Sequence, residues 1–201
     1  MTPAGGSAPA DRQRPERRAR RPWGRAALPF VALAVVAVLD LVAESRRWPL
    51  PVVGLLDEPA HLITAGLVLV ALPAGTRPLW SWALVGAVAI DVDHGPLYLY
   101  GDAVAGDGGR PVTHSMATVL LLLAAAAAVR RYRCALAGLA CGVALHLVRD
   151  LATGPGVPLL WPLPGAAQVP YPLYAAALVG VTLVAVARQL RTPTRSVVTR
   201  P

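Results

Sequence analysis

The chain has 201 residues, of which 55% are hydrophobic and 15% are charged, and its mean hydropathy is +0.53. Soluble domains usually carry about 25% charged residues, so this composition excludes an ordinary water-soluble protein and indicates an integral membrane protein. The 19 basic residues are all arginine and give a formal charge of +8. Many lie in the first 25 residues and most others flank apolar runs, which argues against nucleic acid as a partner.

Six apolar runs follow one another between two polar tails. The tails, residues 1–25 and 191–201, are predicted to be disordered because they have little to bury. The apolar runs cover residues 26–43, 59–72, 79–90, 114–129, 134–148 and 171–187. They predict an all-α fold, a polytopic transmembrane helical bundle of about six spans, with residues 26–190 as one domain. Several runs are shorter than the ~20 residues that cross a bilayer, so five or four spans remain alternatives.

The arginines orient this bundle in the membrane. If the N-terminus is cytoplasmic, threading six spans puts 15 of the 19 arginines on the cytoplasmic side. The outer side then keeps Arg46, Arg47, Arg110 and Arg149. Because this asymmetry agrees with the positive-inside rule, we expect both termini in the cytoplasm. The first run follows an arginine-rich segment, as a signal peptide does, but the later runs favour an uncleaved anchor.

The same threading brings all four histidines to the outer ends of spans: His61, His94, His114 and His146. Two of them have a carboxylate four residues away. His61 follows Asp57, and His146 precedes Asp150, so each pair shares one face of a helix. Pro59, between Asp57 and His61, is predicted in the first turn of that helix, where its missing N–H costs nothing.

The other two histidines lie in denser motifs. Asp91-Val92-Asp93-His94 ends the third run, and the following Gly-Pro pair predicts a break in the helix. Thr113-His114-Ser115 follows Arg110 where the fourth run begins. Imidazole and carboxylate together suit Zn²⁺, Mn²⁺ or Fe²⁺, and the residues suffice for one or two ions. A bound ion with an open position would activate water as a nucleophile.

Structural interpretations of the same residues remain open. A histidine at a span end is often an interfacial polar group, and an aspartate there is often a cap or stop signal. Asp40, inside the first run, could relay protons, lie near the mouth of the site or pair with a nearby arginine. Tyr171 and Tyr174 are predicted in an aromatic belt, and residues 101–110 in a flexible flap.

These motifs resemble, in order, those of the membrane-bound metal-dependent hydrolases, also called the LexA-binding, inner-membrane-associated hydrolase family. The resemblance covers about residues 57–165 and also includes the Leu-Leu-Trp-Pro segment that ends at Pro162. It implies a multi-pass protein of the bacterial inner membrane with a divalent-metal site and hydrolase activity. Among the divalent ions that suit these residues we expect Zn²⁺, with Mn²⁺ and Fe²⁺ as alternatives. By matched position it implies a site formed by Asp91, Asp93, His94, His114, His146 and Asp150, with His61 as a further ligand.

We therefore expect an integral-membrane metal-dependent hydrolase that activates water against a phosphoester, ester or amide. The substrate would be a lipid or lipid-linked molecule that enters from the bilayer. Asp93 or Asp57 would act as general base, and Arg110 or Arg149 would bind an anionic group. The alternative is a non-catalytic protein, either a metal-binding transporter or a metal-stabilised structural subunit. A transporter should hold its ligands near the bilayer midplane, whereas these collect at one end.

Overall fold

The computed structural model describes residues 22–100 and 109–191, and the regular secondary structure among these residues is helical, with no strand. Most of the predicted tails and of the predicted flap, residues 1–21, 192–201 and 101–108, lie outside the described residues. The helices are α1 (Pro22–Glu44), α2 (Leu50–Ala71), α3 (Trp80–Ala89), α4 (His94–Tyr100), α5 (Met116–Ala128), α6 (Arg133–Asp150) and α7 (Tyr171–Arg191). Short 3₁₀ turns connect some of them: η1 (Ala74–Leu79), η2 (Ile90–Asp93) and η4 (Arg130–Tyr132).

Each of the six predicted apolar runs lies in a helix, but not every helix is long enough to be a clear span. Three helical segments have the length and apolar composition to cross a membrane: Ala26–Glu44, Val52–Ala71 and Tyr171–Arg191. Helix α5 is apolar but shorter, and α3 has 10 residues. The structure therefore supports a membrane-spanning helical protein with three such helices.

Two expectations about prolines are wrong. Helix α2 begins at Leu50, so Pro59 lies inside the helix instead of in its first turn. Its missing N–H leaves the Leu55 carbonyl without the usual helical donor, a loss that helices in membranes tolerate. The Gly95-Pro96 pair does not end the helical path either, because α4 starts at His94 and accommodates Pro96 in its first turn.

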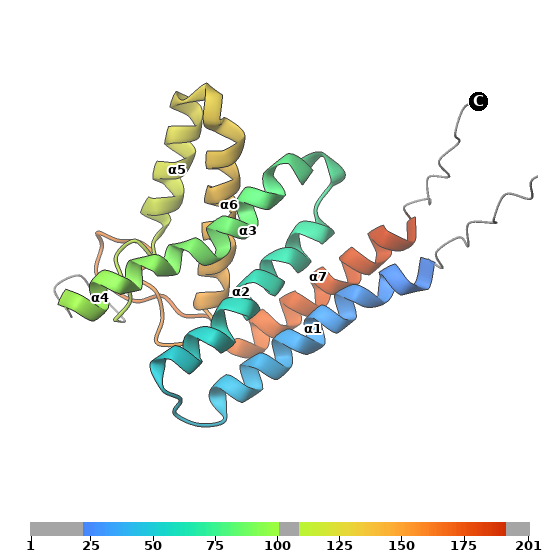
Figure 1. Cartoon of the computed structure of the whole chain (residues 1–201), viewed down its shortest axis with the longest axis horizontal. Coiled ribbons are helices and arrows are strands. Elements are labelled where there is room, and N and C mark those ends of the chain that lie inside the picture. The colour runs from blue at the N-terminus through green and yellow to red at the C-terminus, as the bar shows by residue number, and fades with distance from the viewer. Residues whose placement is uncertain (1–21, 101–108, 192–201) are drawn as a thin grey trace, which may run out of the picture.

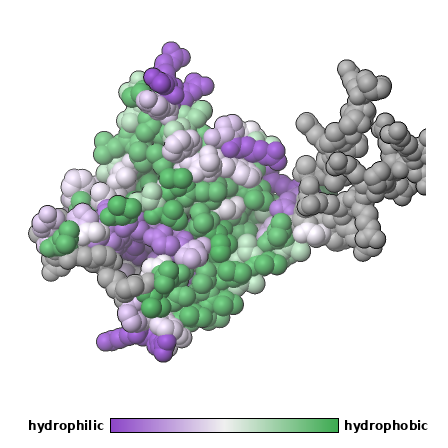
Figure 2. Space-filling view, in the orientation of Figure 1, coloured by the Kyte–Doolittle hydropathy of each residue, from purple (hydrophilic) through white to green (hydrophobic). Residues whose placement is uncertain are grey.

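The helices form two groups that share α2 (Figure 1). Helices α1, α2 and α7 pack against one another, whereas α6 packs between α3 and α5. Helix α2 also contacts α3 and α6 and so connects the groups. Figure 2 shows a largely hydrophobic face over these helices, interrupted by a hydrophilic recess. Large apolar side chains such as Leu28, Leu55 and Leu121 are exposed, which is typical of helices that face lipid.

Glycines let α6 approach α3 closely. A Cβ atom on Gly142 would lie 2.1 Å from the Ala83 carbonyl oxygen, and one on Gly138 would lie 2.6 Å from Cβ of Trp82. The two glycines are four residues apart, as in the small-residue motif of close helix pairs in membranes. His146 follows at the same spacing, so this contact carries the histidine to the side of α3.

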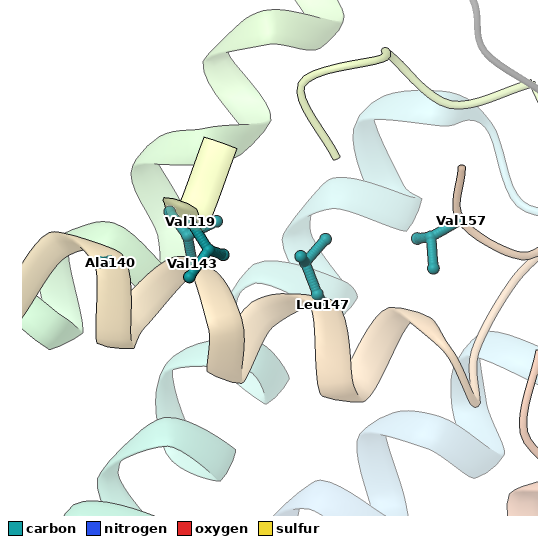
Figure 3. Packing of buried hydrophobic residues seen from close by; sticks show 5 residues of the cluster. All are labelled: Val119, Ala140, Val143, Leu147 and Val157. Carbon is teal, nitrogen blue, oxygen red and sulfur yellow. The ribbon is translucent and has the colours of Figure 1, made fainter. Parts of the chain in front are cut away.

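A small hydrophobic core holds α5 and α6 against the segment after α6 (Figure 3). It consists of Val119, Ala140, Val143, Leu147 and Val157. Residues 151–170 fold back over the end of α6, where the Met116 N–H donates to the Leu159 carbonyl at the start of α5. The same segment therefore anchors the turn that precedes α5.

Candidate metal centre

The four histidines come from separate parts of the chain and meet in one cluster, in which His94 is the one that is partly exposed. His94 begins α4, His114 immediately precedes α5, and His146 lies one turn before the end of α6. The prediction that His61 lies at the end of a span is wrong, because α2 begins at Leu50 and His61 lies midway along it. The rings of His61 and His146 are stacked, with centroids 3.7 Å apart and planes 8° apart. The His114 ring lies 5.1 Å from the His146 ring and 5.0 Å from the His94 ring, centroid to centroid.

The close contact between α3 and α6 orients His146. Its Nδ1 donates to the Ala87 carbonyl oxygen over 2.8 Å, and the residue is 1% exposed. A neutral imidazole that donates from Nδ1 has a lone pair on Nε2. That Nε2 faces two carboxylate oxygens, Asp150 Oδ2 at 3.0 Å and Asp91 Oδ1 at 3.5 Å. Acceptors therefore face acceptors, an arrangement that a cation between them would stabilise.

His61 and Asp57 form a second part of the cluster with Asp150. The Nε2 atom of His61 lies 3.4 Å from Asp57 Oδ2 and 3.3 Å from Asp150 Oδ1. Neither ring nitrogen of His61 has a hydrogen-bond partner of suitable geometry among the described residues, although the residue is only 2% exposed. Asp150 is fully buried at the C-terminus of α6, where the helix dipole disfavours a negative charge.

The third part of the cluster is built by the tight turn η2. Because three residues complete a 3₁₀ turn, Asp91 and His94 lie on the same side, with Asp91 Oδ1 3.2 Å from His94 Nδ1. Asp93 Oδ1 lies at the same distance from this nitrogen. His114 uses both ring nitrogens, with Nε2 3.0 Å from Asp91 and Nδ1 3.1 Å from Asp93. The Thr113 hydroxyl also donates to Asp93.

These contacts shift the pKa values of Asp93 and His94, which lie at the more exposed edge of the cluster. Burial alone would raise the pKa of Asp93, but hydrogen bonds from His114, His94 and Thr113 lower it to about 2. Hydrogen bonds to Asp91 and Asp93 raise the pKa of His94 to about 10. Asp93 is therefore ionised at neutral pH, as a metal ligand must be, whereas His94 carries a proton that a bound ion would displace.

The donor set fits a divalent transition metal. Four overlapping groups of histidine and carboxylate have ligand atoms that all lie within 4.8 Å of one another. A protonated stacked pair of His61 and His146 would bring two positive rings together, whereas a metal ion would satisfy the same lone pairs without that repulsion. Imidazole and carboxylate are the ligands that Zn²⁺, Mn²⁺ and Fe²⁺ share.

Two arginines lie beside the cluster, each paired with acidic residues. Arg110 Nη1 contacts Asp150 Oδ2 at 2.8 Å. Arg149 Nη2 donates to Asp40 Oδ1 over 2.7 Å and to Asp57 Oδ1 over 3.0 Å. Asp57 thus contacts both His61 and Arg149, and it connects the histidine cluster to the arginine network.

An open cavity of about 650 Å³ adjoins this network. Its polar lining includes Asp40, Asp57, Arg110 and Arg149, and Leu41 is among its apolar residues. Cavities of this volume accommodate small-molecule ligands. Gly154 also lines it and adopts a φ of +80°, and a Cβ atom there would lie 2.9 Å from Arg110 Nη2. Glycine at this position therefore leaves Arg110 room to reach Asp150.

All ten site residues predicted from the sequence lie in or beside this one cluster: Asp57, His61, Asp91, Asp93, His94, Arg110, His114, His146, Arg149 and Asp150. Sequence reasoning missed Glu58, whose side chain hydrogen-bonds with Asp91 and has a buried Oε2 atom.

The sequence analysis assigned Tyr171 and Tyr174 to an aromatic belt. Instead the Tyr171 hydroxyl donates to Asp40 and the Tyr174 hydroxyl contacts Thr64. Asp40 pairs with Arg149, which is distant in the sequence.

Comparison with curated proteins and with solved structures finds no match. The model of one protein family matches residues 57–199, a range that begins at Asp57 and includes every histidine of the cluster. Helix α1, with Asp40, lies before this range. Together with the three apolar helices, the match makes this chain an inner-membrane protein. The chain belongs to the YdjM inner membrane protein family.

Proposed function

We propose that this protein is a membrane-embedded metal-dependent hydrolase. The observation that carries the proposal is the gathering of four histidines and four aspartates in one partly buried cluster next to an open cavity. When bound, a divalent ion would lower the pKa of coordinated water and polarise the substrate oxygen. The residues of the chain would hold the ion, orient the substrate and accept a proton.

Within this proposal Asp57 is a better general base than Asp93. Asp57 lines the cavity, and its side chain is 29% exposed. A carboxylate at that wall can accept a proton from water that enters through the cavity. Asp93 is not among the lining residues of the cavity and is held by Thr113 and His114. Asp93 would therefore serve as a ligand.

An amphiphilic substrate suits the cavity. Its lining is largely apolar, and it includes Leu41 and Val53, which are 72% and 39% exposed on membrane-spanning helices. A lipid or lipid-linked molecule could enter from the bilayer past these side chains. The cleaved bond would be a phosphoester, ester or amide. Arg110, which lines the cavity, would bind the negative charge that develops on the substrate during the reaction.

We further propose six spans with both termini in the cytoplasm and the centre at the outer side. The start of α1 and the end of α7 lie side by side (Figure 1). The turns η1 and η4 and the end of α7 carry arginines, as cytoplasmic segments do: Arg77, Arg130, Arg131, Arg188 and Arg191. Asp40 lies near the opposite end of α1, whereas His61 lies midway along the candidate span Val52–Ala71 of α2.

The test is metal analysis and turnover of the full chain purified in detergent. Wild-type protein loaded with Zn²⁺ or Mn²⁺ should hydrolyse a member of a phospholipid or polyprenyl-phosphate panel. The His114→Ala/His146→Ala double variant should lose bound metal and turnover while keeping its helical content. Hydrolysis that persists in this folded, metal-free variant would refute the proposal. Stable metal binding with no turnover would favour a structural role for the ion.

A further inference from the structure

Two of the four overlapping ligand groups share no residue with each other. Asp91, Asp93, His94 and His114 form one group, and Asp57, His61 and Asp150 form the other. The first is built by η2, the start of α4 and the turn before α5, and the second by α2 and the end of α6. In each group the ligand atoms lie within 4.8 Å of one another. Each group alone offers the three or four ligands that a transition-metal ion takes from a protein.

His146 and Asp150 lie where the two groups meet. The Nε2 atom of His146 faces Asp91 of the first group and Asp150 of the second. Asp150 presents one oxygen to His61 at 3.3 Å and the other to His114 at 3.7 Å. A carboxylate whose two oxygens face different histidines is suited to bridge two ions.

The charge of the centre also exceeds what one divalent ion would balance. Two arginines, Arg110 and Arg149, contact it. Its ionised carboxylates would be Asp40, Asp57, Asp91, Asp93 and Asp150, because Glu58 keeps its proton as the donor of its hydrogen bond with Asp91. Once bound ions have displaced the histidine protons, the formal charge of the side chains is about −3, so a single divalent cation would leave uncompensated negative charge in the site and a second would offset it.

We propose that the cluster is a two-ion centre, with one cation held by Asp91, Asp93, His94 and His114 and the other by Asp57, His61 and Asp150. This inference rests on the proposed metal-dependent function and specifies it further: in a two-ion centre Asp57 is a ligand through the oxygen that faces His61, and this role replaces that of general base. His146 and Asp150 connect the two cation positions. A paired centre would stabilise both the attacking and the leaving oxygen when a phosphoryl group is displaced. It therefore favours phosphoesters among the substrates considered above.

The experiment is a saturating Mn²⁺ titration of the full chain in detergent, read by metal analysis and by electron paramagnetic resonance. Wild-type protein should bind about two ions per chain and give the spectrum of magnetically coupled Mn²⁺, because paired ions in such centres lie about 4 Å apart. His94→Ala and His61→Ala, one from each group, should each retain about one ion and give an uncoupled spectrum. Cys134→Ala, which removes an exposed thiol at the far end of α6, should match wild type.

Saturated wild-type protein with one ion per chain and an uncoupled spectrum would overturn the two-ion centre. This result does not depend on whether the variants fold. One ion together with turnover would leave the hydrolase proposal standing and remove this inference. Two coupled ions without turnover on any ester or phosphoester would support the two-ion centre and refute the hydrolase proposal.

Discussion

Arg149 on α6 and Asp40 on α1 form an ion pair of 2.7 Å in which both residues are buried. The same guanidinium group also donates to Asp57 on α2, which contacts His61. Two membrane-spanning helices are thereby joined to the end of the helix that carries His146. The pair links the packing of the helices to the geometry of the metal centre.

We predict that Arg149→Met destabilises the protein by about 3–5 kcal/mol, because it leaves Asp40 as a buried charge without its partner and also removes the partner of the part-exposed Asp57. Chemical unfolding in detergent would measure this loss. The exposed Arg46, whose guanidinium stacks on Trp48, provides the control, and Arg46→Met should cost less than about 1 kcal/mol. Adding Asp40→Asn to Arg149→Met should recover part of the loss. Equal effects of Arg149→Met and Arg46→Met would contradict the role of the pair.

Removal of the metal should also lower stability. Without a cation the buried aspartates repel one another, and the Nε2 atom of His146 faces carboxylate oxygens. An ion present at 100 times its dissociation constant contributes about 2.7 kcal/mol, so a chelator should lower the Tm clearly. The His114→Ala/His146→Ala double variant should show the same Tm with and without chelator. If the Tm of the wild-type protein is the same with and without chelator, the result would count against a bound ion.

The close approach of α3 and α6 gives a prediction about Gly142. Gly142→Ala would put a Cβ atom 2.1 Å from the Ala83 carbonyl oxygen, so the helices must separate. We expect a loss of about 1–3 kcal/mol and a lower metal content, because the bond from His146 to Ala87 would be strained.

The matched control is Gly180→Ala on α7, where a new Cβ atom would meet nothing within 4 Å. This change should leave the metal content unchanged and be neutral or mildly stabilising, since alanine favours helices. Unchanged Tm and metal content in Gly142→Ala would show that the close contact does not position the centre.

Much of the fold could be predicted because apolar runs and helices coincide in a membrane protein. Helix boundaries were harder to predict where the prediction rested on a proline. Pro59 suggested a helix start, but α2 begins at Leu50, because an apolar segment with proline inside still gains more from staying helical in lipid. The Gly138 and Gly142 spacing was readable from the sequence and would have indicated the close contact of α6 with α3.

The residues of the candidate site could be predicted because histidines paired with aspartates are rare at span ends. Which of these residues lie next to one another could not be predicted from the sequence, because it depends on how α2, α4 and α6 pack. The pair of Asp40 and Arg149 joins residues 109 positions apart, and no local pattern indicates it. Glu58 was hidden for a different reason, since it sits in the same motif as Asp57 but reaches Asp91.

The proposed orientation can be tested with the cysteines of the chain itself. Cys134 is exposed in the first turn of α6 beside η4, which we assign to the cytoplasmic side, and Cys141 can be replaced by alanine. A membrane-impermeant maleimide should label Cys134 in right-side-out vesicles only after permeabilisation. In a background without both cysteines, Ser45→Cys, at the exposed turn after α1, should react without permeabilisation. Labelling of Cys134 in sealed vesicles with protection of Ser45→Cys would invert the topology and move the metal centre to the cytoplasmic side.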